Sequence, residues 1–429
     1  MPVEPKVTQI GEKLRLLRVR TQNTKTTCIS VVLMMPLLKN TAENTVLASF
    51  LAHASAKYPT LSRLNERLEE LYGAILSADV SKLGEGYRLR FSLTCIRDDL
   101  ALAGEERLSV EALRLLLELL FSPHAENGAF DKTQLETEVR LCVEDIESEL
   151  NDKRAYALSR CLEIMCADEP FGVSKTELLE AVRAVTPESM FNAWQQLLRE
   201  ATVSVQVIGN VDFAPLEEML REKLASQKGD RVPAEIQTVF VEAAEDVTEV
   251  TEEMDVNQSK LVLGFRTGMR DCDDDYFATR LMTDLFGGGP YSRLFMHVRE
   301  KLSLCYYCSA RLDRYKGLLM VQSGIERKNK DAAFDEIQKQ LQVMQNGEFT
   351  DEEFAASKAA LCDAFRGIDD TPEGLDAYYA MSPEGAVRTP EDMVKGLAAV
   401  TREDVVRAAK RLTLDTVYLL AGKEEAVNA

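Results

Sequence analysis

Histidine is scarce in this chain of 429 residues, which limits the metal chemistry that the sequence supports. The three histidines, His53, His124 and His297, are far apart, and no two form a local pair. Zinc sites in proteins need several imidazole, thiolate or carboxylate ligands around one ion. We therefore predict no locally built metal site and no bound cofactor, and we expect an isolated histidine such as His53 to make an ordinary hydrogen bond.

The nine cysteines do not have the paired spacing of a disulfide framework. The closest pair, Cys305 and Cys308, encloses two tyrosines in a strand-like run. Residues three apart on a regular strand point to opposite faces, so we predict that these two thiols share neither a metal nor a redox bond. The cysteines are expected to be reduced, as they are in cytoplasmic proteins.

Three consecutive glycines, Gly287, Gly288 and Gly289, are a candidate for close backbone approach, since glycine has no Cβ and accepts positive φ angles. A phosphate-binding loop needs Gly-Lys-Ser/Thr or a Gly-x-Gly-x-x-Gly spacing, and the sequence here has neither. The run therefore predicts either a loop lining the path of a ligand or a tight entry into the helix that begins near Tyr291.

The elements that must position these residues occur twice along the chain, in the same order. Phe130 and Phe349 open similar segments 219 residues apart (349 − 130), and Thr186 and Thr401 begin similar helices 215 residues apart (401 − 186). Both threonines are typical helix N-caps. Because the two offsets agree within a few residues, we interpret the chain as a duplication. The other matched segments are the strand-like runs 27–37 and 260–269, 86–93 and 317–324, and 202–209 and 416–422.

The duplication predicts two homologous domains, residues 1–225 and 238–429, joined by a polar, turn-rich linker at 226–237. Strands and helices mix in each half without strict alternation. This favours the α+β class, with an antiparallel-rich sheet packed with helices in each domain. A hydrophobic content of 45% is enough for two full-size cores.

The formal net charge of -20 opposes non-specific binding to nucleic acid or to an anionic membrane. Nowhere do 18 apolar residues run together, and residues 1–30 lack the pattern of an export signal. We therefore expect a cytoplasmic protein with no nucleic-acid or membrane partner.

Two stretches carry a family resemblance. One is Ser-Phe-Leu-Ala-His at 49–53, on a predicted helix whose buried stripe includes Leu47 and Phe50. The other is Gly-Gly-Gly-Pro-Tyr-Ser-Arg-Leu-Phe at 287–295, followed by Val-Arg-Glu-Lys-Leu-Ser-Leu-Cys-Tyr at 298–306. On these residues the chain resembles the insulysin, pitrilysin and mitochondrial processing peptidase family over nearly its whole length. The resemblance implies a duplicated LuxS/metallohydrolase-like fold.

In that family the first stretch is an inverted zinc motif, His-x-x-Glu-His, and a later helix adds a glutamate ligand. Ser49 and Ala52 stand at the positions of the first histidine and the glutamate base, whereas His53 and Glu138 match the other two ligands. Serine is a poor zinc ligand, and alanine cannot take a proton from a metal-bound water. The resemblance therefore implies a degenerate zinc site and no catalysis by this chain alone.

The second stretch matches the family's arginine and tyrosine, which lie seven residues apart and reach the substrate at the cut bond. The matching residues here are Arg299 and Tyr306, and the resemblance makes Gly287, Gly288 and Gly289 a loop lining the peptide path. Arginine offers a fork of donors, and a tyrosine hydroxyl can donate to a developing oxyanion. The alternative is that Arg299 pairs with a neighbouring acid and Tyr306 packs within a strand.

The favoured hypothesis is a non-catalytic subunit of a heterodimeric zinc peptidase. It acts with a homologous zinc-bearing subunit on a peptide that adds as a strand to a sheet edge. Residues 58–60 and 68–74 are similar to bacterial family members associated with modification of elongation factor P. Two alternatives stay open. One is a stand-alone peptide-binding or scaffolding homodimer without protease activity, and the other is an active metallopeptidase with unusual ligands.

Overall fold

Two units that interleave along the sequence make up the computed structural model, which describes residues 4–22, 24–102, 107–225, 231–270, 273–382 and 387–422. Unit 1 contains residues 1–145, 176–237 and 366–390, and unit 2 contains residues 146–175, 238–365 and 391–429. Neither unit is a single contiguous stretch. One change of unit falls between Gln237 and Thr238, at the end of the expected linker, and residues 226–230 of that linker lie outside the described residues.

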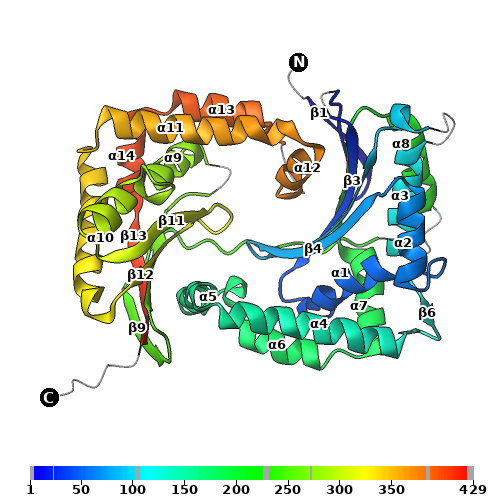
Figure 1. Ribbon diagram of the computed structural model, residues 1–429, viewed down its shortest axis with the longest axis horizontal. Coiled ribbons are helices and arrows are strands. Elements are labelled where there is room, and N and C mark those ends of the chain that lie inside the picture. The colour runs from blue at the N-terminus through cyan, green and yellow to red at the C-terminus, as the bar shows by residue number, and fades with distance from the viewer. Residues whose placement is uncertain are drawn as a thin grey trace. The chain divides into compact units, whose positions relative to one another are not determined.

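A six-stranded sheet forms the centre of unit 1 (Figure 1). Its strands are β1 (Pro5–Gly11), β2 (Leu14–Val19), β3 (Thr26–Pro36), β4 (Ile75–Leu83), β5 (Gly86–Ile96) and β8 (Thr202–Ile208), in the order β1-β2-β8-β3-β5-β4. The central strand β3 is antiparallel to β5 on one side and to β8 on the other, and β2 runs parallel to β8. Nine of the eleven residues of β3 are buried, because helices cover both faces of the sheet.

The helices of unit 1 pack on opposite faces of this sheet. Helix α3 (Leu108–Phe121) packs on β3 and β5, and helix α12 (Pro372–Ala380) packs on β3 and β8. Successive residues of a strand point to opposite faces. Leu117 of α3 lies beside Val31, whereas Asp376 of α12 bonds to Ser30. The other helices in the first half of the chain are α1 (Thr41–His53), α2 (Leu61–Glu70), α4 (Lys132–Asn151), α5 (Lys153–Met165), α6 (Lys175–Arg183), α7 (Pro187–Glu200) and α8 (Phe213–Ala225).

A five-stranded sheet forms the centre of unit 2. Its strands are β9 (Thr248–Met254), β10 (Ser259–Arg266), β11 (Cys305–Asp313), β12 (Leu318–Ile325) and β13 (Thr413–Gly422), in the order β11-β12-β10-β13-β9. Helix α5 packs on β10 and β13, where Met165 joins a core cluster with Val262 and Tyr418. The second half also contains α9 (Tyr276–Gly287), the π-helical η3 (Leu294–Lys301), α10 (Lys330–Asn346), α11 (Asp351–Arg366), α13 (Pro390–Ala399) and α14 (Arg402–Arg411).

The two sheets repeat one strand order. In unit 1 the order β2-β8-β3-β5-β4 corresponds to β9-β13-β10-β12-β11 in unit 2, and in both the first pair is parallel while the others are antiparallel. Thr186 and Thr401 cap equivalent helices, α7 and α14, each within a capping box. The predicted α+β class and the duplicated sheet packed with helices are confirmed.

Each sheet is covered in part by a helix from the other half of the sequence. In Figure 1 the orange helix α12 lies against the dark blue strand β3, although they come from distant parts of the chain. In each unit a buried carboxylate holds the helix from the other half of the sequence against the sheet. Asp376 of α12 accepts hydrogen bonds from Arg90 of β5, and Glu169, just after α5, pairs with Arg266 of β10 and with Lys316. Buried charges persist only when paired in this way.

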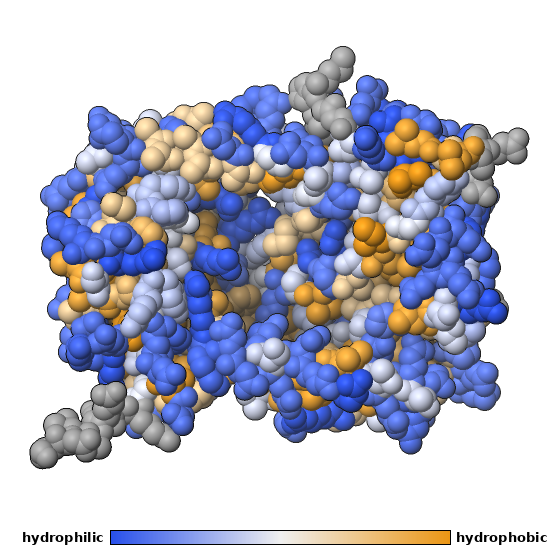
Figure 2. All heavy atoms as spheres, viewed as in Figure 1, coloured by the Kyte–Doolittle hydropathy of each residue, from blue (hydrophilic) through white to orange (hydrophobic). Residues whose placement is uncertain are grey.

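Hydrophilic side chains cover most of the face shown in Figure 2, with hydrophobic side chains in small separate groups. This is the surface expected of a chain with 28% charged residues. Within the described part of the chain, none of the helices combines the length and the apolar character that a membrane crossing requires.

Candidate functional site

His53 and Glu138, which are distant in sequence, lie in direct contact. The Nδ1 atom of His53 is 2.6 Å from Oε1 of Glu138. His53 is the last residue of α1, and Glu138 lies in the second turn of α4. Gln134 of α4 donates a hydrogen bond to the Phe50 carbonyl of α1, and the Phe50 ring packs on that of Phe130, two residues before α4, with 4.7 Å between the centroids. Packing of the apolar stripe of α1 therefore positions the histidine.

The environment of this pair favours a charged imidazole. The hydrogen bond to Glu138 raises the pKa of His53, and burial opposes it. The Glu138 side chain is 5% exposed and that of His53 is 37% exposed. The second carboxylate oxygen of Glu138, Oε2, is buried without a hydrogen-bond partner among the described residues. One imidazole and one carboxylate thus remain together at the end of α1.

Arg299 projects from the π-helical segment η3. Its guanidinium lies over the Phe295 ring, 4.5 Å from the centroid, and its Nε is 3.6 Å from a carboxylate oxygen of Glu300. The side chain remains 40% exposed. π-Helical segments are rare in proteins, and those that occur are often found at functional sites. Here the guanidinium stacks on an aromatic ring and remains accessible.

Tyr306 stands in a β-bulge at the start of β11. Cys305 pairs with Ile325 and Tyr307 pairs with Gly324, so Tyr306 is the extra residue without a partner on β12. Tyr306 is 61% exposed. The exposed Tyr306 side chain therefore does not pack within the strand, whereas Arg299 pairs with the neighbouring acid Glu300, as the alternative expects.

The sequence has clear relatives. Residues 184–361 match the family described as peptidase M16 inactive domain. "Probable inactive metalloprotease YmfF" of Bacillus subtilis (strain 168) is 32% identical over 410 residues, covering 95% of this chain and 96% of that protein. This chain belongs to the M16 peptidase family. The resemblance to insulysin, pitrilysin and the mitochondrial processing peptidase is thereby confirmed.

Solved structures of M16-like proteins share the whole fold. A conserved protein from Enterococcus faecalis V583 superposes with a TM-score of 0.89 at 28% identity, covering 98% of this chain and 99% of that one. The peptidase M16 inactive domain from Pseudomonas fluorescens gives a TM-score of 0.78 at 16% identity, with 100% of both chains covered. At 16% identity the second match supports the fold alone.

The residues predicted to stand at the family's zinc position do not fit a zinc ion. The hydroxyl of Ser49 donates to the carbonyl of Val46 in its own helix, at 3.1 Å, and the side chain of Ala52 has no ligand atom. Of the four predicted positions, His53 and Glu138 carry side chains that commonly bind zinc. Within the described ranges, no group of three or more histidine, cysteine, aspartate or glutamate side chains could hold a metal ion. Two ligands are too few for a catalytic zinc site.

An open sheet edge lies beside the helix that carries His53. Strand β4 pairs with β5 on one side, and no other described strand pairs with its second side. Helix α1 contacts both β4 and β5. Ile75, the first residue of β4, is among the exposed large hydrophobic residues. An edge of this kind offers unpaired main-chain groups to an extended peptide.

The three glycines are accounted for by packing at the end of α9. A Cβ on Gly287 would lie 2.5 Å from the backbone nitrogen of Ala310 in β11, so glycine is required for this close approach. Gly288 is the C-cap of α9 with φ -79, and Gly289 lies against the ring of Tyr291. Tyr291 in turn donates to Asp284 at 3.0 Å, which closes the loop.

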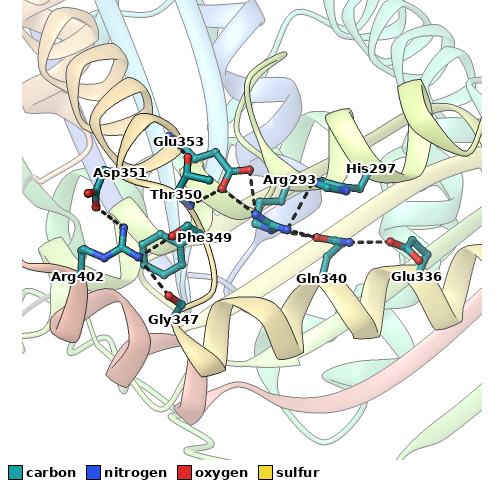
Figure 3. A network of polar contacts seen from close by, with 10 residues as sticks. All are labelled: Arg293, His297, Glu336, Gln340, Gly347, Phe349, Thr350, Asp351, Glu353 and Arg402. Carbon is teal, nitrogen blue, oxygen red and sulfur yellow. Dashed lines mark hydrogen bonds and ion pairs between the residues drawn. The ribbon is translucent and has the colours of Figure 1, made fainter.

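Arg293, in the same motif, is a buried anchor that the sequence pattern does not single out. Figure 3 shows its guanidinium between Glu353 of α11 and Gln340 of α10, at 2.8 to 2.9 Å from each. His297 lies on the other side, and the pKa of His297 is lowered by burial and by the arginine charge. The anchor ties η3 to two helices. Arg293 belongs to the motif, but the sequence does not indicate its buried role, because its partners lie far along the chain.

The expectation that Cys305 and Cys308 point to opposite faces is wrong. The bulge at Tyr306 adds one residue to β11, so Cys308 pairs with Ser323 and Cys305 pairs with Ile325. Ser323 and Ile325 are two apart on a regular strand and point to the same face. The two thiols therefore share that face, and both are free cysteines.

Proposed function

We propose that this M16 homologue is the non-catalytic subunit of a heterodimeric zinc peptidase. It binds peptide and supplies Arg299 and Tyr306 to the active site of a homologous, zinc-bearing partner. The observation that carries the proposal is a contrast within the chain. The helix at the zinc position has lost a ligand and the base, whereas the arginine and the tyrosine are retained and exposed.

The chemistry of these two residues suits action on a partner's substrate. The Arg299 guanidinium can donate to a peptide carbonyl or terminal carboxylate, and Glu300 at 3.6 Å is too far for a strong hydrogen bond that would retain it. The Tyr306 hydroxyl can donate to the oxyanion that develops when water adds to the peptide carbonyl. The partner supplies the zinc-bound water. Neither residue needs a metal in its own chain.

The open edge of β4 supports the peptide-binding part of the proposal. Strand addition uses main-chain hydrogen bonds, which every peptide sequence can form, so it suits a broad substrate range. The edge lies next to α1, the helix that carries the zinc ligands in active relatives. The same strand in a zinc-bearing homologue is expected to bring a bound peptide to its metal.

The test compares this chain alone, a zinc-bearing homologue alone and their mixture in a peptide cleavage assay. Cleavage is expected from the mixture and not from this chain. The variant Tyr306→Phe should lower the mixture's kcat on the order of 10²-fold, the usual effect of removing one donor to a developing oxyanion. Arg299→Ala, which removes the donors to the substrate carbonyl or carboxylate, should act in the same direction.

A matched control is Arg270→Ala. Arg270 also pairs with a nearby acid, Asp273, and lies over a phenylalanine ring, that of Phe240. It should leave cleavage unchanged. Full activity of the Arg299→Ala mixture, with assembly intact by sedimentation, would remove the proposal.

The alternative is a stand-alone peptide-binding or scaffolding homodimer without protease activity. It is favoured by the edge of β4, which needs no partner chain to receive a peptide. Self-association of the pure chain, with peptide affinity that a zinc-bearing homologue does not change, would support this alternative over the heterodimer.

A further inference from the structure

The Cys305 and Cys308 thiols form a pair that a regular strand would separate. Both point to the same face of the sheet as Ser323 and Ile325 of the neighbouring strand β12. Both are buried, with exposed fractions of 8% for Cys305 and 4% for Cys308. The Ser323 hydroxyl donates to the carbonyl of Tyr307 at 3.1 Å, which holds the backbone between the two cysteines against β12. The bulge therefore places both thiols on one face of the strand, with the exposed Tyr306 between them in the sequence.

The two thiols differ in acidity. The hydrogen bond from Cys308 lowers the pKa of Cys305, with burial opposing and the positive charge of Arg299 assisting. The same hydrogen bond, together with burial, raises the pKa of Cys308 well above its ordinary value. A thiolate-prone cysteine next to a neutral thiol is the arrangement of an attacking and a resolving cysteine.

Other described cysteines lack this arrangement. Burial is the main cause that raises the pKa values of Cys28, Cys95, Cys142, Cys161 and Cys166. A thiol with a raised pKa is less often a thiolate and so reacts slowly in exchange. Cys305 and Cys308 differ from these cysteines in their shared face of β11 and in the lowered pKa of Cys305.

We propose that Cys305 and Cys308 form a reversible disulfide in exchange with small-molecule disulfides of the glutathione type. The Cys305 thiolate attacks one sulfur of the oxidant, whose S–S bond breaks and releases one thiolate. That thiolate takes the proton of Cys308, and the resulting Cys308 thiolate attacks the Cys305 sulfur of the mixed disulfide. The second thiolate leaves and is protonated from solvent. The protein dithiol loses two electrons, and the oxidant is reduced to two thiols.

The disulfide would regulate the site described above, and this part rests on the proposed function. Closing the bond joins the residues on both sides of Tyr306 and fixes the bulge that turns the tyrosine outward. It also removes the ionisable Cys305 thiol, whose pKa the charge of Arg299 helps to lower. Both effects change how the arginine and tyrosine are presented. The oxidised chain is therefore expected to assist a zinc-bearing partner less well than the reduced chain.

The first experiment uses the full chain alone and does not depend on a partner. The reduced protein is equilibrated with mixtures of reduced and oxidised glutathione, trapped with an alkylating reagent and mapped by peptide mass. The expected result is a peptide in which Cys305 is linked to Cys308, while the other thiols are alkylated. Alkylation of both cysteines at every ratio of the two glutathione forms would overturn the proposal.

Single substitutions test the two roles. Cys308→Ser should stop the reaction at a glutathione adduct on Cys305, whereas Cys305→Ser should leave Cys308 unmodified. Cys142→Ser is the control and should not change the linked peptide. If a serine variant unfolds, which circular dichroism would reveal, the alanine variant takes its place. An equal adduct on Cys308 in the Cys305 variant would remove the assigned roles.

The second experiment measures cleavage by the mixture of this chain and a zinc-bearing homologue, with the chain reduced or oxidised. A loss of cleavage on oxidation that is reversed by dithiothreitol, and is absent in the Cys305→Ser variant, supports regulation. Equal cleavage by both forms overturns regulation, although the mass map still decides the disulfide. A mixture that never cleaves faster than the partner alone counts against the proposed function, and leaves the thiol result standing.

Discussion

The imidazole of His53 and the carboxylate of Glu138 are joined by a hydrogen bond of 2.6 Å, although the described residues around them provide no third ligand for a zinc ion. The bond joins the last residue of α1 to the second turn of α4. It also gives the degenerate site a measurable property, since the bond favours the protonated imidazole.

A shifted titration of His53 is the first prediction. Its pKa should lie above the ordinary value of 6.5, and Glu138→Gln should lower it, because the substitution removes the negative charge and weakens the hydrogen bond. Proton NMR of the histidine rings measures both. Since the folded-state pKa is raised, the pair stabilises the fold fully below the unfolded-state pKa, and the contribution is lost as pH rises through the folded-state pKa.

The same titration therefore predicts a pH-dependent difference in stability. The free energy of unfolding of wild type should exceed that of Glu138→Gln by more at about pH 5.5 than at about pH 8.5. Denaturant unfolding at the two values checks this. A difference that grows toward alkaline pH would contradict the assignment of the charged pair.

Restoring the missing ligands should restore metal binding. The double substitution Ser49→His with Ala52→Glu rebuilds His-x-x-Glu-His on a helix whose His53 and Glu138 are already in contact. We expect stoichiometric zinc in the purified double variant by elemental mass spectrometry, removable by a chelator, and none in wild type. The single variant Ala52→Glu is the control, because it adds a carboxylate without the imidazole. Equal zinc in wild type and double variant would show that the site was never degenerate.

Loss of the Arg293 anchor should destabilise unit 2. Arg293→Ala leaves Glu353 and Gln340 without their buried partner, and breaking a buried pair costs about 3–5 kcal/mol. Arg63→Ala, which removes an exposed pair with Glu66, should change stability by less than about 1 kcal/mol. Chemical denaturation followed by fluorescence compares the two. Similar losses from both would indicate that the network in Figure 3 is not a packing anchor.

The close approach at Gly287 predicts a third effect on stability. Gly287→Ala forces a Cβ to within 2.5 Å of the Ala310 nitrogen, and such overpacking costs about 1–3 kcal/mol. Gly367→Ala is a matched control, because its nearest neighbour would be 3.8 Å away, and it should be neutral or slightly stabilising. The thermal midpoints of the two variants measure the difference. A neutral Gly287→Ala would mean that α9 does not need to approach β11 so closely.

The order of helices and strands along the chain is predictable from the sequence, because the two halves of the repeat can be compared with each other. The spacing of Phe130 and Phe349, and of Thr186 and Thr401, identifies equivalent segments of the two halves from the amino acids alone. The buried stripe around Phe50 locates α1 correctly, and with it the position of His53. These features depend on local periodicity and on capping, which a single sequence displays directly.

Local irregularities are not predictable in the same way. The wrong facing expected for Cys305 and Cys308 assumes a regular strand, and one extra residue at Tyr306 is enough to reverse it. The π-helical turn that carries Arg299 and the partners of Arg293 also leave no periodic signal, because each depends on tertiary contacts. Helices α5 and α12 likewise look ordinary in sequence, and only the folded chain reveals which sheet each one covers.

That reciprocal placement of α5 and α12 bears on how such a protein could arise. The two helices begin 219 residues apart (372 − 153), the same offset as Phe130 and Phe349, so they occupy equivalent places in the two halves of the chain. In a half-length ancestor, part of the sheet would have been uncovered unless two copies exchanged this helix. In a fused chain of two copies the exchange takes place within one molecule. A chain cut between the halves is therefore expected to give two fragments that need each other to fold.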